Sequence, residues 1–224
     1  MLFRSLMFGP DARLYGAQNG RKRIVAWSPG GEESVIAEGL DSNDLAVSSR
    51  GAVYVTDPPG KRVWLLDGTG GKRIVYEARG REGIQFPNGV RFSPDESLLL
   101  VADYSNKWVW SFQVQPDGSL DHGQPFYHLE TLDDSSQAGP DGMTVDNEGH
   151  LYVATRLGIQ VCDQPGRVVA IFAKPHPGAL SNVVFAGPNL DLLYVTAGDR
   201  VYRRRLRRKG VFPWQPVMPP QPRL

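Results

Sequence analysis

The chain has 224 residues, which is enough for one large domain or two small ones. Its 41% hydrophobic and 22% charged residues are a globular composition, and its net charge of +1 gives no long-range field to attract nucleic acid or an anionic membrane. The single cysteine excludes a disulfide within the chain, and the absence of any run of 18 apolar residues predicts no transmembrane helix.

A short β-rich run recurs five times along the sequence, at 13–17, 52–57, 98–103, 151–155 and 192–196. The copies are about 40 to 50 residues apart, a period typical of repeat architectures. Each copy follows a turn cluster and a short apolar strand, as at 45–47 or 183–185. A third strand follows, as at 62–66 or 108–112, and usually a fourth, as at 73–76 or 168–172. Four short antiparallel strands per repeat predict the blades of an all-β propeller, with little helix.

The last copy is incomplete, because after the strand at 200–206 the chain turns into a Pro-rich tail. We therefore predict a propeller domain over 1–211, incomplete at its N-terminus, and a tail over 212–224. Four full blades and three further strands do not make up a closed ring of complete blades. We therefore expect that roughly 50 to 75 residues, about one blade, are missing before residue 1. The first residues do not predict a secretory signal and so favour the cytoplasm, although an upstream signal would have been lost with such a segment.

Four polar residues begin the innermost strand of four successive copies: Asn43, Asn88, Asp141 and Asn182. Each lies 11 or 12 residues before the centre of the next strand, so the four side chains should surround the central channel at one depth. Turn geometry alone can place Asn or Asp before a strand, but four in register favour a site. Amide and carboxylate oxygens suit Ca²⁺, Mg²⁺ or Mn²⁺. Only Asp141 is anionic, so we expect a second acid from the missing blade.

Other candidates carry a weaker signal. Asp103 and Asp57 follow the second strand of their blades, where they either line the cavity or cap a strand end. His176 lies in a loop, where a solvated histidine is the default. Cys162 lies in an apolar run and is predicted to be a buried structural thiol. No Gly-x-Ser-x-Gly, Walker, His-Glu-x-x-His or Cys-x-x-Cys motif is present, which disfavours a serine-triad hydrolase.

The motifs at 42–45, 86–90, 140–143 and 181–196 resemble the gluconolactonase/regucalcin (senescence marker protein) family, over about residues 6–210. The resemblance implies a six-bladed lactonase-type propeller, here with about five blades, that holds one divalent cation and hydrolyses a sugar lactone to the aldonic acid. It implies that Asn88 and Asp141 bind the metal and that Asn43 binds substrate. Asp141 would also be the catalytic base. The family's glutamate ligand has no counterpart in this sequence.

The expected cation is Ca²⁺, with Zn²⁺, Mn²⁺ or Mg²⁺ as alternatives. From their loop positions, Tyr104, Arg156 and His176 are expected to contact sugar hydroxyls, and Asn182 and Asp103 to support the site. The alternatives are a truncated, inactive propeller that binds a small ligand or ion, and a propeller that binds protein partners by its faces. An open ring exposes apolar blade surface, so we expect marginal stability, closure into a tighter five-bladed ring, or a homodimer through the incomplete edge.

Overall fold

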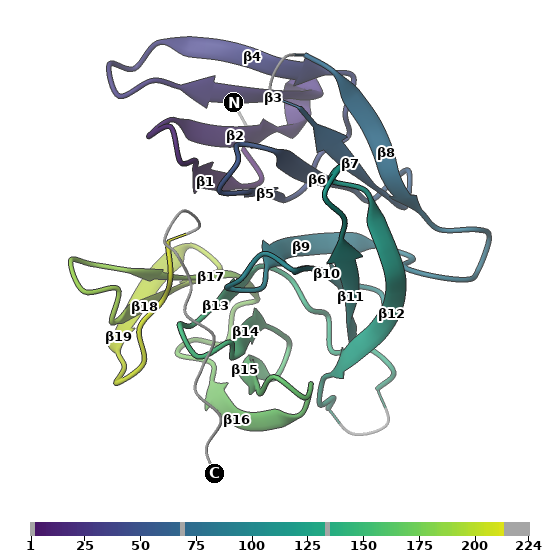
Figure 1. Cartoon of the computed structure of the whole chain (residues 1–224). Coiled ribbons are helices and arrows are strands. Elements are labelled where there is room, and N and C mark those ends of the chain that lie inside the picture. Colours follow the sequence, from purple (N-terminus) through teal and green to yellow (C-terminus); the bar gives the residue numbers. More distant parts are fainter. Residues whose placement is uncertain (1–2, 68–69, 133–134, 213–224) are drawn as a thin grey trace.

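The computed structural model describes residues 3–67, 70–132 and 135–212. These residues form five antiparallel sheets that follow one another in chain order (Figure 1). One 3₁₀ turn, η1 (Asn19–Arg21), is the only helical segment in these ranges. Within the same ranges, no helix is long and apolar enough to cross a membrane. The predicted all-β propeller with about five blades is confirmed.

The first four blades have four strands each. The first contains β1 (Leu6–Phe8), β2 (Leu14–Gln18), β3 (Arg23–Trp27) and β4 (Glu33–Glu38). The second contains β5 (Leu45–Val47), β6 (Val53–Asp57), β7 (Arg62–Leu66) and β8 (Lys72–Glu77). The third contains β9 (Pro87–Phe92), β10 (Leu98–Asp103), β11 (Trp108–Val114) and β12 (Leu120–His128). The fourth contains β13 (Met143–Val145), β14 (Leu151–Ala154), β15 (Gly158–Cys162) and β16 (Val168–Ala173).

The fifth blade has only three strands: β17 (Leu180–Ala186), β18 (Leu192–Ala197) and β19 (Arg200–Arg205). This agrees with the incomplete last repeat of the sequence. Of the predicted tail, residues 213–224 lie outside the described residues.

Burial explains the composition of each strand. The second strands lie between neighbouring strands and have both faces covered, so β6 and β14 are buried at every residue and read as continuous apolar runs. The outer strand β16 instead alternates half-buried and exposed residues, as expected where one face meets solvent. A tight turn joins β5 to β6, where Gly51 adopts φ +81° and its N–H donates to the carbonyl of Ser48 at 2.9 Å.

The apolar core lies between the blades. One buried cluster packs each adjacent pair of sheets, as with Met7, Tyr15 and Leu45 between the first and second blades. Corresponding clusters join the second to the third, the third to the fourth and the fourth to the fifth. Between the first and the fifth blades, the described residues instead line an open cavity of about 580 Å³, which residues of the third and fourth blades also border. Exposed Leu6 and Phe8 lie on one side of it and Val184 on the other.

Cys162 lies at the end of β15, fully buried in the cluster between the third and fourth blades. Burial raises the pKa of its thiol to about 12. Because the thiolate is the reactive form, we expect no reaction of the native protein with an aromatic disulfide reagent at pH 8 within an hour, and one equivalent after unfolding in guanidinium. Rapid stoichiometric labelling of the native protein would contradict the buried position.

Candidate metal and substrate site

The structure brings the four inner-strand residues together at one end of the sheets. The Asn43 side-chain amide donates to Asn88 Oδ1 at 3.0 Å. The Asn88 side chain also acts on the Asp141 carboxyl group, whose pKa it lowers. The amide of Asn182 lies against the Cα of Gly142, where an added Cβ would be 2.2 Å from Asn182 Oδ1. We call these four residues, Asn43, Asn88, Asp141 and Asn182, the polar ring.

The same backbone arrangement positions the ring residues of the second and fourth blades. The N–H of Asn43 donates to the carbonyl of Thr56 at 2.8 Å, and the N–H of Asp141 donates to that of Ala154 at 2.9 Å. Each bond joins the start of an inner strand to the second strand of its own blade. The Thr56 hydroxyl also donates to the carbonyl of Asn88 at 2.7 Å, which connects the second blade to the third. The ring residues therefore project from rigid, hydrogen-bonded backbone.

Asp44 lies directly beside the ring and was given no role from the sequence. Its side chain is buried, and its Oδ1 accepts hydrogen bonds from the Ser5 hydroxyl and, at 2.8 Å, from the Leu45 N–H. Its Oδ2 accepts from the Val90 N–H at 2.9 Å. The carboxylate thus joins the first three blades. The sequence feature that could have identified Asp44 is its position as an acidic residue immediately before a fully buried strand.

Asp141 is the electrostatically unusual member of the ring. Burial and, secondly, the negative charge of Asp44 raise its pKa to about 7, against opposing effects of the Asn88 hydrogen bond, the Gly142 N–H and the charge of Arg4. Arg4 was also not identified from the sequence. A carboxyl group that titrates near neutral pH, next to convergent amides, marks a candidate functional site.

The ring residues fit a hard divalent cation. The Asn88 amide oxygen and the Asp141 carboxylate are oxygen donors, and an amide oxygen that accepts one hydrogen bond from Asn43 retains a second lone pair. In the part of the chain that the structure describes, no group of three or more His, Cys, Asp or Glu side chains converges. Because the side chains of Asn88 and Asp141 offer oxygen donors, their chemistry suits Ca²⁺ or Mg²⁺ better than a metal that prefers imidazole or thiolate.

The three loop residues expected to contact sugar have contacts of their own. Tyr104 packs against Phe86, with ring centroids 5.6 Å apart. Arg156 is exposed and donates to Gln137 Oε1 at 3.0 Å. The Nδ1 atom of His176 accepts a hydrogen bond from the Gly178 N–H at 3.0 Å. Their contact with substrate stays a prediction.

Asp103 and Asp57 stabilise loops. Asp103 is fully buried, and its carboxylate accepts hydrogen bonds from the N–H groups of Gln85 and Phe86 at 2.9 and 3.0 Å and from the loop that follows it. It thereby fixes the segment that leads into Asn88. Asp57 accepts from the Gly60 N–H and from the indole of Trp64, both at 3.0 Å. Of the two interpretations offered by the sequence, the strand-end role describes both residues.

The cavity between the first and fifth blades is separate from the polar ring. Its lining includes Phe8, Phe92 and Val145, which lie at the last residues of inner strands, whereas the ring residues lie before or within the first three residues of theirs. No ring residue lines it. This cavity is therefore not where the polar groups converge.

Known proteins support the relationship suggested by the motifs. The family model described as SMP-30/gluconolactonase/LRE-like region matches residues 6–199. Gluconolactonase of Zymomonas mobilis is 28% identical over 90% of this chain and 62% of its own length. Pentonolactonase XacC of Haloferax volcanii is 29% identical over 69% of this chain and 52% of its own length.

Solved structures share the fold. A gluconolactonase from Xanthomonas campestris superposes with a TM-score of 0.75 at 24% identity, covering 90% of this chain and 71% of its own. A calcium-binding protein, regucalcin, from Agrobacterium tumefaciens superposes with a TM-score of 0.75 at 18% identity, covering 94% and 78%. The chain spans less than two thirds of the length of the curated relatives described above. With the family model matched over most of its residues, the chain belongs to the SMP-30/gluconolactonase/LRE-like family.

Proposed function

We propose that this protein hydrolyses a sugar lactone with the help of one divalent cation, for which Ca²⁺ is the first candidate. Asn88 and Asp141 bind this cation. The observation that carries the proposal is the hydrogen bond from Asn43 to Asn88 beside the Asp141 carboxyl group, whose pKa is raised to about 7. The names of the relatives, gluconolactonase and pentonolactonase, support the substrate class.

The residues of the polar ring have different roles in the proposed reaction. The Asp141 carboxylate accepts a proton from the attacking water, and a pKa near the working pH is the best compromise for a general base. The water oxygen bonds to the lactone carbonyl carbon, and the ring ester C–O bond breaks. The leaving alkoxide takes this proton back from Asp141, and the aldonic acid is released. Asn43 and Asn88 are amides fixed by backbone contacts, so they orient substrate and cation without changing charge. A bound cation would polarise the carbonyl and stabilise the negative charge that develops on its oxygen.

A second candidate is a propeller that binds a cation or small ligand without catalysing hydrolysis. It is favoured by the charge of the site, since Asp141 is the only carboxylate of the ring and Asp44 already accepts three hydrogen bonds. One carboxylate is few for a divalent ion. The two candidate functions differ only in whether the protein hydrolyses a lactone.

The test measures hydrolysis and binding on the same protein. We expect the chain to accelerate acid release from glucono-δ-lactone when Ca²⁺ is present, to fall to the uncatalysed rate in EDTA, and to recover when Ca²⁺ is restored. Titration calorimetry should detect Ca²⁺ binding to the EDTA-treated protein. Binding without acceleration would favour the second candidate, and the absence of both would contradict both.

Substitution of the metal-ligand asparagine provides a matched comparison. Asn88→Ala removes one predicted oxygen ligand and the side chain that lowers the pKa of Asp141, so we expect at least about a tenfold weaker Ca²⁺ affinity, the range typical of lost metal-site support. Asn147→Ala changes an exposed turn residue and should leave affinity and turnover unchanged. Equal affinities of the two variants would remove Asn88 from the proposed site.

A further inference from the structure

An arginine begins the inner strand of the first blade at the position where other blades carry a residue of the polar ring. The N–H of Arg4 donates to the carbonyl of Ala17 at 3.0 Å, and the N–H of Ala17 donates back to the carbonyl of Ser5 at 3.0 Å. The same pair of backbone bonds joins the strand start at Asn43 to the second strand of its blade, and the strand start at Asp141 to the second strand of its own. Arg4 therefore holds, in the first blade, the register position of Asn43 and Asp141.

The backbone at Arg4 is fixed while its side chain stays accessible. The neighbouring side chain of Ser5 is buried and donates a hydrogen bond to Asp44 of the second blade. Successive side chains of an extended chain point to opposite sides, so Arg4 projects away from this buried contact, and it is exposed. A ligand can therefore reach the guanidinium without a rearrangement of the fold.

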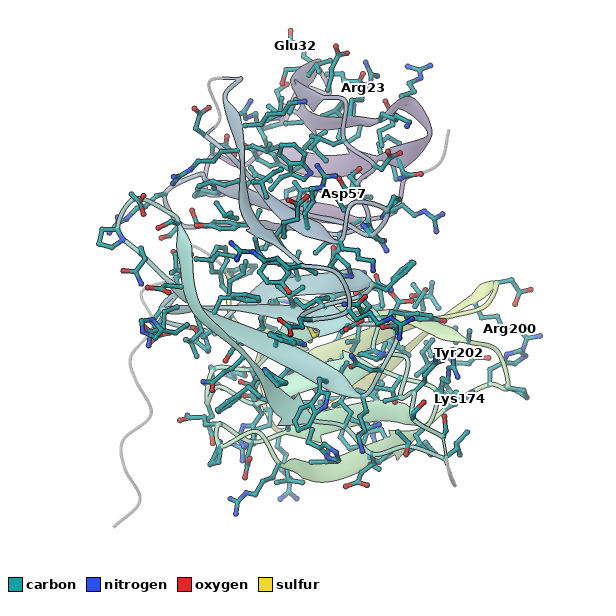
Figure 2. The ribbon with its side chains drawn as sticks, turned by 90° about the vertical axis from the view of Figure 1, so that its right-hand side faces the viewer. Arg23, Glu32, Asp57, Lys174, Arg200 and Tyr202 are labelled. Atoms are coloured by element: carbon teal, nitrogen blue, oxygen red, sulfur yellow. The ribbon has the colours of Figure 1, made fainter. Side chains whose placement is uncertain are left out.

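The guanidinium of Arg4 acts on the polar ring through its charge. Burial and the charge of Asp44 raise the pKa of Asp141, and the positive charge of Arg4 opposes them. Among the described residues, no carboxylate forms an ion pair with Arg4. In Figure 2 the labelled Asp57 ends β6 and Arg200 begins β19, so both mark the end of the sheets at which the inner strands begin. Arg4 brings a positive charge to that same end.

The charges of the site match the product of the proposed reaction better than its substrate. A lactone is neutral, whereas its hydrolysis leaves a carboxylate that is ionised at neutral pH. The amides of the ring are neutral, and the acids Asp141 and Asp44 oppose an anion, so a carboxylate needs a positive partner there. A guanidinium binds a carboxylate through two parallel N–H···O bonds, a geometry that an ammonium group does not supply.

We propose that Arg4 binds the carboxylate of an aldonate beside the polar ring, while the amides of Asn43 and Asn88 hydrogen-bond its hydroxyl groups. The identity of the ligand rests on the proposed function, because an aldonate is the product of lactone hydrolysis. The contact with Arg4 strengthens as the neutral carbonyl of the substrate gains negative charge. Arg4 therefore also stabilises the transition state relative to the bound lactone.

Gluconate and sorbitol provide a matched pair of probes. The two molecules are polyols of equal chain length, and gluconate alone carries a carboxylate. The full chain is first freed of cations with EDTA and then of EDTA by gel filtration, so that binding reports the protein's own residues. We expect titration calorimetry to show gluconate binding, and binding of sorbitol that is at least about tenfold weaker.

Substitutions of Arg4 identify the partner of the carboxylate. Arg4→Gln should weaken gluconate binding at least about tenfold, the range for a lost hydrogen bond between charged groups, and should leave sorbitol binding unchanged. Arg4→Lys keeps the charge but not the paired N–H donors, so its gluconate affinity should lie between those of Arg4→Gln and the wild type. Arg50→Gln, at the exposed turn between β5 and β6, should change neither affinity.

Hydrolysis gives a second and separable measurement. With Ca²⁺ present, Arg4→Gln should lower kcat, and it should raise the inhibition constant of gluconate by a larger factor than the KM of the neutral lactone. A residue that only stabilised the fold would instead change the urea midpoint of unfolding. That midpoint should stay constant, because the side chain of Arg4 is exposed.

Three results would each overturn the proposal: undetectable gluconate binding to the wild type, equal gluconate affinities of the wild type and Arg4→Gln, or an equal loss of sorbitol affinity in that variant. Failure of the proposed function gives a different result. Gluconate binding that depends on Arg4, without hydrolysis, would contradict the lactonase activity and leave the anion site. Hydrolysis with gluconate binding that does not depend on Arg4 would contradict only the role of Arg4.

Discussion

Asp141→Asn is expected to abolish lactone hydrolysis and, in the same variant, to stabilise the cation-free protein at pH 8. The loss of activity follows from the removal of the ring's only carboxylate, which the proposed mechanism uses both to bind the cation and to accept a proton from water. At least a thousandfold loss of kcat/KM is reasonable when base and ligand are lost together. The gain in stability has an independent electrostatic cause.

The sign of the stability effect follows from the pKa of Asp141. The pKa is about 7 in the folded chain, against an ordinary value of 3.8 that holds in the unfolded chain. Between these values the folded state holds a proton that the unfolded state has released. The free energy of unfolding therefore falls as pH rises from about 4 to about 7, and above pH 7 the full cost of burying the charge is present. An asparagine cannot ionise, so it removes that cost, worth roughly 2 to 4 kcal/mol at pH 8.

Urea unfolding in EDTA measures this effect. We expect Asp141→Asn to exceed the wild type in stability at pH 8 and to match it near pH 4, where Asp141 is protonated in the folded state. Asp199→Asn is the matched control, because the side chain of Asp199 is 86% exposed and its substitution should be nearly neutral at both pH values. Equal stability of wild type and Asp141→Asn at pH 8 would show that burial of the Asp141 carboxylate does not destabilise the folded protein. Retained hydrolysis would remove it from the mechanism.

The positions of the ring residues were predictable because they depend on the repeat. Asn43, Asn88 and Asp141 occupy one register position in three blades, and a propeller carries equivalent positions to its central axis. The raised pKa of Asp141 was not predictable, because it depends on burial and on the charge of Asp44, which Arg4 opposes, and both charged residues approach it from other blades. A single sequence shows which residues begin a strand but not which neighbours face them across two sheets.

Loop residues were the hardest to place. Tyr104, Arg156 and His176 were grouped by their loop positions, yet each contacts a different residue, namely Phe86, Gln137 and Gly178. The direction of a loop side chain follows from turn geometry rather than from strand period. The bulges in the outer strands β4, β8, β12 and β16 were also not predicted, since a bulge adds one residue without a fixed sequence signal.

Asp44→Ala is expected to lower the free energy of unfolding by about 3 kcal/mol or more. Asp141→Asn, at the neighbouring acid, is expected to raise it. The change leaves the Ser5 hydroxyl and the N–H groups of Leu45 and Val90 without their acceptor, and each buried unpaired donor costs about 1 to 3 kcal/mol. It also removes the negative charge that acts on the guanidinium of Arg91. Asp117→Ala is the matched control, because its carboxylate accepts hydrogen bonds from Ser119 at an exposed turn and should matter by less than about 1 kcal/mol.

Asp44→Asn tests the same network if the alanine variant does not fold. The amide keeps one oxygen acceptor and the shape of the side chain but lacks the charge, so we expect a smaller loss of stability and a lower pKa of Asp141, measured by NMR titration of the cation-free protein. An unchanged Asp141 pKa would mean that burial alone raises it. A lowered pKa would identify Asp44 as the residue that keeps Asp141 basic enough to accept a proton near neutral pH, while its hydrogen bonds hold the first three blades together. Asp44 would then couple the stability of the propeller to the chemistry of its polar ring.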